Sequence, residues 1–389
     1  MKFTVSSSVL LKHLSVCNRA VAQKGTGSIL SCILFRAEGG QLHLTAADEE
    51  MTISTCFELP SIIEEGVACV PAKLLIDALK AYPDIPLEFS LDEEHRQVRA
   101  SFDQGVKVGD FALQYESVSD FPEFPELDAE SQAKLTMPGD MFVSGINHTL
   151  YAASQGEGMG AENKGVRIEV CAEGMRFVTT DAFRLPLYTL SEYTTEQPHT
   201  MFISYKAAQT IQSIIPTDDD AVQLQFDDNK LLINTPTLQF VCQLMEDHFP
   251  SYEMLLKPEF PDVLKVDTGL LLNAFRQVVP FSQGVHHLVG LEVKDNRLTM
   301  SADNDFYNSS ARQSMECTYD GQERSIYMNA EKVAEVVSTI YSEFTVVRFS
   351  PEVNQVVFEP SEPEDEHVSY KVLVALNQVS TSDFTSSIE

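Results

Sequence analysis

The fold of this chain is decided by a strand opening that occurs three times in the sequence, as Phe3-Thr4-Val5, Leu135-Thr136-Met137 and Leu264-Lys265-Val266. Each opening leads into an amphipathic helical stretch, and these stretches begin near Val9, Met141 and Leu270. The openings are spaced by about 130 residues, and self-similarity at a long fixed period is typical of repeated structural units.

Further landmarks recur at the same period. A strand that ends in small residues before an acid occurs as Thr45-Ala46-Ala47-Asp48, Val178-Thr179-Thr180-Asp181 and Met300-Ser301-Ala302-Asp303. A strand-to-helix entry follows as Val70-Pro71-Ala72-Lys73, Ile203-Ser204-Tyr205-Lys206 and Met328-Asn329-Ala330-Glu331. The first two units also close alike, with Asp120-Phe121-Pro122 and His248-Phe249-Pro250. Landmarks that repeat in this order predict three homologous domains.

Each unit reads as a strand, a helix and three strands, performed twice. Alternating apolar residues indicate strands at 41–45, 52–57, 87–91 and 106–113, separated by turn residues. Two helices packed on an antiparallel sheet make an α+β domain. We therefore expect domains at residues 1–130, 131–260 and 261–377, followed by a tail at 378–389. That tail is rich in Ser and Thr, a composition that favours disorder.

Composition limits the classes of function. The apolar runs are too short to span a bilayer, and the first residues enter a strand-like pattern without a signal-peptide core, so we expect a cytoplasmic protein with no membrane contact. Seven cysteines without a C-x-x-C pair argue against a disulfide framework and against structural zinc. A net charge of −31 argues against a general nucleic-acid coat protein, because duplex binding depends on Lys and Arg. A DNA role therefore requires a local basic surface.

The predicted helices provide such a surface. In the first helix, an apolar side opposes Lys12 and Arg19, and in the second an apolar side opposes Lys73 and Lys80. The apolar residues are Leu10, Leu14, Cys17 and Val21, then Leu75 and Leu79. Six predicted helices carry eight Lys or Arg against five Asp or Glu. They span residues 9–24, 71–81, 138–154, 204–215, 267–279 and 329–341. Exposed helix faces often carry Lys, but that simpler explanation leaves the scarcity of acids unexplained. A weakly basic layer without stacking aromatics suits sequence-independent contact with phosphates.

Several motifs together resemble the β subunits of bacterial DNA polymerase III, and the resemblance covers nearly the whole chain. They are Met1-Lys2-Phe3-Thr4-Val5, Val70-Pro71-Ala72-Lys73, Thr180-Asp181-x-x-Arg184-Leu185 and Phe249-Pro250-x-Tyr252. The resemblance implies a sliding clamp: a head-to-tail homodimer of six similar domains whose helices line a hole for duplex DNA. It implies no enzymatic activity and no cofactor. The implied partners are the polymerase III alpha subunit, the clamp loader and other clamp-motif proteins.

Domain size favours two chains per ring. A domain of 130 residues has a radius of gyration of about 14 Å, so three such bodies leave a hole of about 6 Å and six leave roughly 36 Å. Groove depths imply a duplex about 20 Å across. One chain therefore cannot encircle it, whereas a head-to-tail interface that closes after two copies allows it.

The resemblance also implies a hydrophobic pocket for client peptides between the second and third domains. It maps to Thr180, Ala182, Phe183, Arg184, Leu185, Pro250, Leu255, Val353, Leu373 and Val374. The family commonly has Gly-His where this chain has Ala182-Phe183, and its C-terminus usually resembles Met-Pro-Met-Arg-Leu. Apolar walls with one guanidinium and one hydroxyl suit an apolar peptide with a polar group. Without the resemblance, these residues read equally well as strand ends and core.

For DNA contact, Lys24 falls where the family places a basic residue, in Lys24-Gly25-Thr26-Gly27. The helix faces add Lys12, Arg19, Lys73, Lys80, Lys206, Arg276 and Lys332.

Other signals point to weaker alternatives. Gly156-Glu157-Gly158-Met159-Gly160 follows a helical stretch and precedes a strand, the reverse of the order in dinucleotide-binding folds. His286-His287 has no partner at metal-ligand spacing. The acids at 218–220 and 227–228 could hold metals in a hydrolase, but they lie at turns where solvated acids are usual. A monomeric peptide-binding scaffold remains the main alternative to a clamp.

Overall fold

The computed structural model describes residues 1–22, 29–128, 133–153, 160, 164–216, 221–282, 287–304 and 307–377. The chain divides into two compact units. One comprises Met1–Val143 with Lys206–Met245, and the other Ser144–Tyr205 with Glu246–Glu389. Each unit is described by itself. The expected domain boundaries near residues 130 and 260 stay a prediction, and the tail at 378–389 lies outside the described residues.

The predicted order of elements occurs three times. The first repeat contains β1 (Lys2–Ser6), α1 (Ser7–Cys17), β2 (Cys32–Glu38), β3 (Gln41–Ala47), β4 (Met51–Glu58), β5 (Ser61–Glu64), β6 (Gly66–Pro71), α2 (Ala72–Lys80), β7 (Pro86–Asp92), β8 (Gln97–Asp103) and β9 (Val108–Gln114). The second contains β10 (Ala133–Pro138), α3 (Gly139–Asn147), β11 (Gly165–Cys171), β12 (Gly174–Val178), β13 (Arg184–Leu190), β14 (His199–Ser204), α4 (Tyr205–Ile214), β15 (Ala221–Phe226), β16 (Lys230–Asn234) and β17 (Leu238–Gln243).

The third repeat contains β18 (Asp262–Asp267), α5 (Thr268–Val278), β19 (Leu288–Lys294), β20 (Arg297–Asn304), β21 (Ser309–Glu316), β22 (Thr318–Asp320), β23 (Arg324–Asn329), α6 (Ala330–Ser338), β24 (Phe344–Phe349), β25 (Gln355–Pro360) and β26 (Val368–Ala375). Short 3-10 helices are η1 (Asn18–Ala20), η2 (Ile29–Ser31), η3 (Val118–Asp120), η4 (Leu150–Ala152), η6 (Tyr252–Leu256) and η7 (Val279–Phe281). The α+β class with helices on antiparallel sheets is confirmed.

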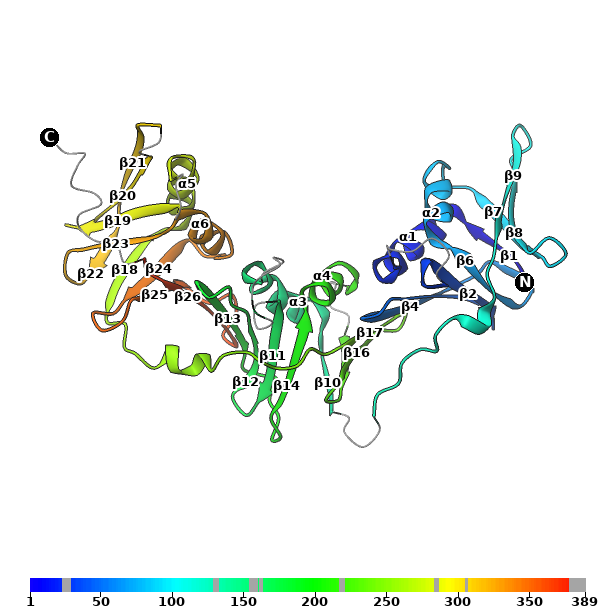
Figure 1. Ribbon diagram of the computed structural model, residues 1–389, viewed down its shortest axis with the longest axis horizontal. Coiled ribbons are helices and arrows are strands. Elements are labelled where there is room, and N and C mark those ends of the chain that lie inside the picture. The colour runs from blue at the N-terminus through cyan, green and yellow to red at the C-terminus, as the bar shows by residue number, and fades with distance from the viewer. Residues whose placement is uncertain are drawn as a thin grey trace. The chain divides into compact units, whose positions relative to one another are not determined.

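The described strands form four sheets, and two of them are shared between repeats (Figure 1). Their orders are β5-β1-β7-β8-β9, β10-β15-β16-β17-β4-β3-β2-β6, β14-β11-β12-β13-β26-β25-β24-β18-β22 and β21-β20-β19-β23. The junctions are antiparallel: β17 pairs with β4, with Val241 opposite Thr52, and β26 pairs with β13, with Leu373 opposite Leu185. Each shared sheet therefore joins the last strand of one repeat to the third strand after the first helix of the preceding repeat.

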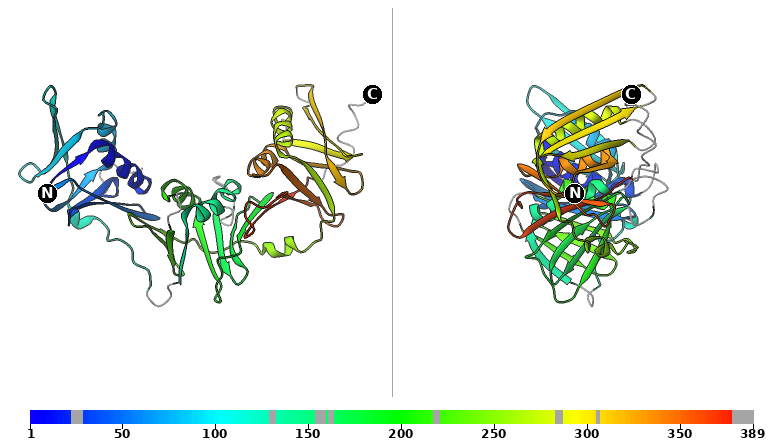
Figure 2. Two further views of the ribbon diagram at one scale, coloured as in Figure 1. Left: turned by 180° about the vertical axis from the view of Figure 1, so that it is seen from behind. Right: turned by 90° about the vertical axis from the view of Figure 1, so that its left-hand side faces the viewer.

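The helices cover one face of these sheets. In the first repeat α1 and α2 lie side by side, and in the third α5 and α6 do the same (Figures 1 and 2). The apolar sides predicted for the first two helices are confirmed, because Leu10, Leu14, Leu75 and Leu79 are at most 1% exposed. The basic residues predicted on the opposite sides are exposed, namely Lys12, Arg19, Lys73 and Lys80.

Three predicted helix limits are wrong. The first helix begins at Ser7, not Val9, because the Ser6 hydroxyl accepts the N–H of Val9 and caps that end. It ends at Cys17, and η1 follows. The helix expected at 138–154 ends at Asn147, and η4 takes up part of the remainder. No helix of the described residues is long and apolar enough to cross a membrane.

Candidate functional site

The residues at the centre of the expected pocket lie at the junction of β13, β26 and β25. Leu373 pairs with Leu185 on one side and with Val357 on the other. Since residues opposite each other in a sheet share a face, these three side chains lie in one row. All three are buried in a single apolar cluster. Val374, the next residue, is also buried but belongs to the other face, because successive strand residues alternate.

The segment after β17 packs on this row. The cluster includes Val178, Leu187 and the fully buried Tyr252, while Phe249, Leu256 and Phe260 pack against it partly buried. The Tyr252 hydroxyl donates to Glu169 Oε2 at 2.5 Å, which satisfies the polar end of the ring. The cluster is thus made of strand residues together with η6 and its flanks.

A tight loop before β13, residues 180–184, forms a rim beside this cluster, and Asp181 organises it. The Oδ1 atom of Asp181 accepts the backbone N–H groups of Phe183 (3.0 Å) and Arg184 (2.7 Å). The Thr180 hydroxyl donates to the carbonyl of Arg184 at 2.9 Å. Ala182 has φ +67°, a left-handed conformation that costs a non-glycine residue about 1–2 kcal/mol. This backbone explains why glycine suits the position.

Arg184 ties the loop to α6. Its guanidinium is buried and donates to Asp181 Oδ2 (3.2 Å), Glu335 Oε2 (2.5 Å) and the carbonyl of Lys332 (3.0 Å). It also lies over the ring of Tyr151, at 5.2 Å from the centroid. The guanidinium therefore holds the rim in place, and several of its donors are engaged within the chain.

Lys332 also belongs to this network. Its ammonium donates to Asp181 Oδ2 at 2.8 Å and lies 3.9 Å from the centre of the Phe183 ring. Burial opposes the charged form of Asp181, but the charge of Arg184 and the hydrogen bond from Lys332 outweigh it. The pKa of Asp181 is consequently held below its usual value.

Of the expected pocket residues, Leu185 and Leu373 belong to the apolar cluster, whereas Val374 lies on the other face of β26. Thr180, Ala182, Phe183, Arg184 and Leu185 follow one another, and Leu373 and Val374 pair with that strand. Pro250 and Leu255 are exposed, and Val353 is half-buried in the turn before β25. Sequence reasoning missed Val178, Leu187, Tyr252 and Val357 in the cluster, and it missed Asp181 as the rim's organiser. Strand parity counted from Leu185 would have found Leu187.

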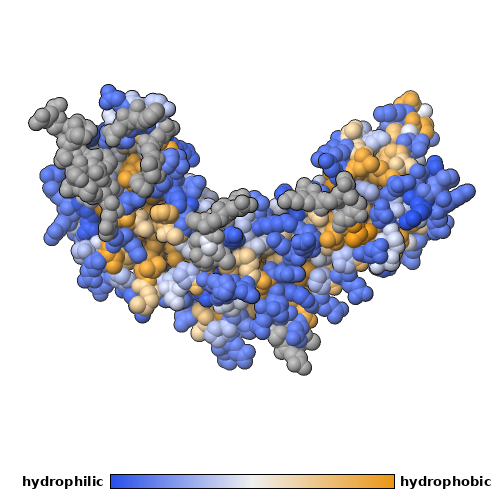
Figure 3. All heavy atoms as spheres, in the orientation of Figure 1, coloured by the Kyte–Doolittle hydropathy of each residue, from blue (hydrophilic) through white to orange (hydrophobic). Residues whose placement is uncertain are grey.

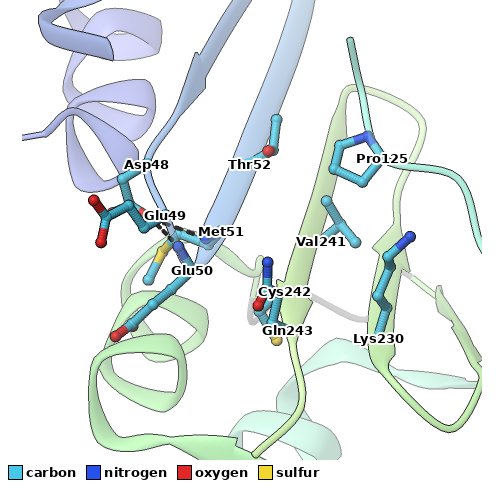
Figure 4. A pocket seen from close by; sticks show the side chains of 10 residues that line it. All are labelled: Asp48, Glu49, Glu50, Met51, Thr52, Pro125, Lys230, Val241, Cys242 and Gln243. Atoms are coloured by element: carbon cyan, nitrogen blue, oxygen red, sulfur yellow. Dashed lines mark hydrogen bonds between the residues drawn. The ribbon is translucent and has the colours of Figure 1, made fainter. Parts of the chain in front are cut away.

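The junction of β17 and β4 repeats this geometry with different chemistry. There Asp48 Oδ1 accepts the N–H groups of Glu50 (2.8 Å) and Met51 (2.9 Å), as Asp181 does in the other junction. Asp48 Oδ2 pairs with Lys206 of α4. A small cavity of about 70 Å³ lies beside this loop, with Glu49 and Glu50 on one side and Lys230 and Pro125 on the other (Figure 4). Met51 stands where the other junction has Arg184.

The expected DNA-contact residues fall into three groups. Lys12, Arg19, Lys73 and Arg276 are exposed and form no ion pair with any described residue. Three others are paired: Lys80 with Asp77, Lys206 with Asp48, and Lys332 with Asp181. Lys24 lies outside the described residues. The six α-helices and η1 contain seven Lys or Arg and four Asp or Glu, so the helix layer keeps a positive balance.

The remaining acids and histidines serve local structure where they are described. Asp227 is buried, not solvated as expected, because its carboxylate accepts the N–H groups of Asp128, Asn229 and Lys230. His287 lies 3.7 Å from Glu331. His286, residues 218–220 and most of the Gly156–Gly160 stretch lie outside the described residues. Within the described ranges, no group of three His, Cys, Asp or Glu side chains is placed to hold a metal.

Two family models match the chain. The N-terminal domain of the DNA polymerase III beta subunit matches residues 1–125, and the central domain of the same subunit matches residues 136–251. Together they cover more than half of the sequence. The chain belongs to the family of bacterial DNA polymerase III beta subunits, the beta sliding clamps.

Relatives and solved structures agree with this assignment. The beta sliding clamp of Escherichia coli is 26% identical over 361 residues, which cover 92% of this chain and 96% of that protein. The crystal structure of the beta subunit from Pseudomonas aeruginosa has a TM-score of 0.87 at 22% identity, covering 97% of this chain and 100% of that chain. The Helicobacter pylori beta clamp bound to a DNA ligase peptide has a TM-score of 0.87 at 17% identity, with the same coverage.

The carboxylate of Asp181 gives a pH-dependent contribution to stability. Its pKa is lowered in the folded chain, so the contribution is complete above the unfolded value of about 3.9 and is lost as the pH falls through the lower folded value. We expect Asp181→Asn to lower the free energy of unfolding by about 3 kcal/mol at pH 7, because it removes one partner of a buried ion pair. The deficit should shrink below about pH 4, as thermal unfolding from pH 7 to pH 3 would record.

Asp77→Asn is the matched control, because its pair with Lys80 is exposed on both sides and should contribute less than about 1 kcal/mol. The asparagine at position 181 keeps an oxygen for the two backbone N–H groups, so the comparison isolates the charge. A deficit that stays constant across the pH range would refute the ion-pair role.

Proposed function

We propose that this chain is a sliding clamp that encircles duplex DNA as a head-to-tail homodimer and tethers the replicative polymerase and other clients. It acts without a catalytic site of its own. Its domains are residues 1–130, 131–260 and 261–377. The observation that carries the proposal is the repeated junction: β17 on β4 and β26 on β13 each join one repeat to the preceding one.

The same pairing between successive repeats leaves two strand edges open, one in the first repeat and one in the last. The two strands concerned lie at the edge of their sheets. One is β9, the last strand of the first repeat, and the other is β21, the third strand after the first helix of the last repeat. β9 corresponds to β17 and β26, and β21 corresponds to β4 and β13. Val108 on β9 and Val106 before it are 69% and 99% exposed, and Figure 3 shows the apolar tip of this hairpin. Pairing β9 of one copy with β21 of another would complete both edges and close a ring of six domains.

The internal junctions also set the register of this interface. Successive cross-strand pairs lead from Phe3 to Phe111, from Leu135 to Phe240 and from Leu264 to Val372. The three residues at the ends of these paths are therefore equivalent. Ala112 therefore corresponds to Val241 and Leu373. Ala311 corresponds to Thr52, because each pairs with the residue immediately before the aspartate that recurs in every repeat. In this register, Ala112 would lie opposite Ala311 of the partner subunit.

An ion pair supports the same arrangement. At each internal junction an aspartate after one strand pairs with a lysine near the start of the next repeat's second helix, as Asp48–Lys206 and Asp181–Lys332. At the open ends the corresponding residues are Asp303 and Lys73, both exposed. Lys73 would therefore pair with Asp303 of the partner subunit. Lys73 thus fits the subunit interface better than DNA.

For DNA contact we propose the exposed cations Lys12, Arg19 and Arg276, together with Lys24. Lys12, Arg19 and Arg276 are few, separate and borne on helices, which suits loose contact with phosphates that permits sliding. For clients we propose the cluster around Leu185 and Leu373. Its apolar row gives pockets for apolar side chains, and a related clamp binds a DNA ligase peptide.

Topological trapping on DNA is the direct test of encirclement. We expect the dimer, once loaded, to stay on circular duplex and to leave when the circle is cut, because a closed ring escapes only at a free end. Gel filtration of the labelled chain with nicked circles, before and after linearisation, measures retention. Equal retention on circular and linear templates would defeat the proposal.

The interface register predicts a specific cross-link. Ala112→Cys combined with Ala311→Cys should form a covalent dimer on mild oxidation, because opposed strand residues lie within the roughly 4.4–6.8 Å that a disulfide spans. Electrophoresis without reductant gives the yield. Ala112→Cys with Gln313→Cys is the control, since its second site is two residues away on the same face. A monomer in solution, or a better yield from the control pair, would overturn the interface and favour a monomeric scaffold.

The client pocket predicts a difference between the two equivalent junctions. Leu373→Ala should weaken binding of a polymerase-tail peptide by about tenfold or more, because it removes a buried apolar contact at the centre of the pocket. Val241→Ala, at the equivalent position of β17, should leave the affinity unchanged. Fluorescence anisotropy of the labelled peptide measures both. Equal effects from the two variants would contradict this assignment.

A further inference from the structure

Two cations lie on the same sheet face as the apolar cluster of β13, β26 and β25. Leu373 faces the side on which η6 packs, and side chains two positions apart along a strand face the same side. Lys371 on β26 is therefore on this side, opposite Leu187. Arg176 on β12 is on it as well, because Val178, two positions along that strand, belongs to the cluster. The cluster thus has two basic neighbours.

Lys371 is half-buried at the edge of the cluster. Leu187, the residue opposite, is only 4% exposed. Residues that oppose each other in an antiparallel pair have Cβ atoms about 5 Å apart, so the aliphatic stem of Lys371 adjoins Leu187. Along β26, Lys371 and Leu373 are separated by about 7 Å. A peptide side chain bound at Leu373 therefore places its neighbours within reach of the Lys371 ammonium.

The surroundings of Lys371 disfavour its charge. Burial lowers the pKa of Lys371, an effect that Glu359 opposes and the guanidinium of Arg176 reinforces. The carboxylate of Glu359 is engaged elsewhere, because its Oε1 accepts Nε of Arg348. Two like charges in a half-buried place are both stabilised by an anion that approaches them.

Arg176 supplies the second cation and contacts the cluster through Tyr252. It is half-buried and interacts with the hydroxyl of Tyr252, which in turn donates to Glu169. Glu169 also accepts a hydrogen bond from Arg167, so its carboxylate has two donors already. The acids around Lys371 and Arg176 are thus held by other groups, and the two cations gain from a further carboxylate.

We infer that Lys371 and Arg176 form an anion subsite of the proposed client site, which binds a carboxylate of the client peptide. This inference rests on the client site proposed above and specifies its ligand: apolar side chains with a carboxylate close to them. An acidic side chain or the C-terminus of the peptide can supply the carboxylate, since both present two acceptor oxygens. The chain carries a net charge of −31, so an acidic peptide is repelled by most of the surface and attracted here.

Peptide binding to the full chain tests the subsite. Three labelled peptides share two adjacent leucines. One has aspartate beside them and an amidated end, one has asparagine and a free C-terminus, and one has asparagine and an amidated end. We expect a carboxylate peptide to bind about fivefold or more tightly than the neutral one, because a half-buried ammonium gains a charged partner. Fluorescence anisotropy gives the affinities, and the peptide that shows the gain identifies the source of the carboxylate.

Variants of Lys371 show whether this cation is responsible. Lys371→Met keeps the stem and removes the charge, so the ratio of the two affinities should fall to about one, whereas Lys371→Arg should keep the ratio. Lys265→Met is the matched control. Lys265 is an exposed lysine on the same face of the sheet, on β18, and its ammonium lies 4.5 Å from the centre of the Phe344 ring. Its loss should leave the ratio as in the unmodified chain.

The outcomes separate the anion subsite from the client site itself. If Leu373→Ala weakens the neutral peptide but all three peptides bind the unmodified chain equally, the client site stands and the anion subsite is refuted. A ratio that survives Lys371→Met, or that Lys265→Met lowers as much, would also overturn the subsite. If none of the peptides binds the unmodified chain, the client site is contradicted, and the subsite with it.

Discussion

Main-chain hydrogen bonding between repeats is the constraint on which the rest of the structure depends. A short antiparallel sheet has two edges, and their N–H and C=O groups need partners. Here the last strand of one repeat supplies the partner for the preceding repeat, as β17 does for β4. The shared sheets explain why the two compact units cut through the second repeat: the units follow hydrogen-bonded sheets, whereas the repeats follow the sequence.

The aspartates at the junctions strengthen this arrangement. Asp48 and Asp181 each use one oxygen to hold two backbone N–H groups of the turn and the other to hold a cation from the next repeat. A single side chain therefore fixes both the turn and the neighbouring helix. At Asp181 the pair is buried and reinforced by Arg184, whereas the lysine partner of Asp48 is half-exposed and contributes less.

Much of the fold could be predicted from the sequence, and less of the site. Element order followed from three repeated landmarks, because period-2 and period-3.6 patterns survive divergence of individual residues. Helix ends were less predictable, since a cap such as Ser6 acts through one hydrogen bond that no periodicity records. Which residues share the apolar cluster depended on the strand register between β13 and β26. That pairing brings together residues almost 190 positions apart in the sequence. The role of Lys332 also lay beyond the sequence, because a cation on a helix looks the same whether it faces phosphate or Asp181.

The two internal junctions share one strand arrangement but differ in side-chain chemistry. Their strands pair in the same register, yet Leu185 and Leu373 become Thr52 and Val241 at the other junction. The rim residues Ala182 and Phe183 become Glu49 and Glu50, and the cavity beside them is small. Burial of apolar area contributes about 25 cal/mol per Å², so an apolar peptide gains most where the row and its η6 wall are apolar. Acids at the rim of the other junction would in addition have to lose water without a partner. Side chains, and not the arrangement of strands, therefore set the proposed client site apart from the other junction.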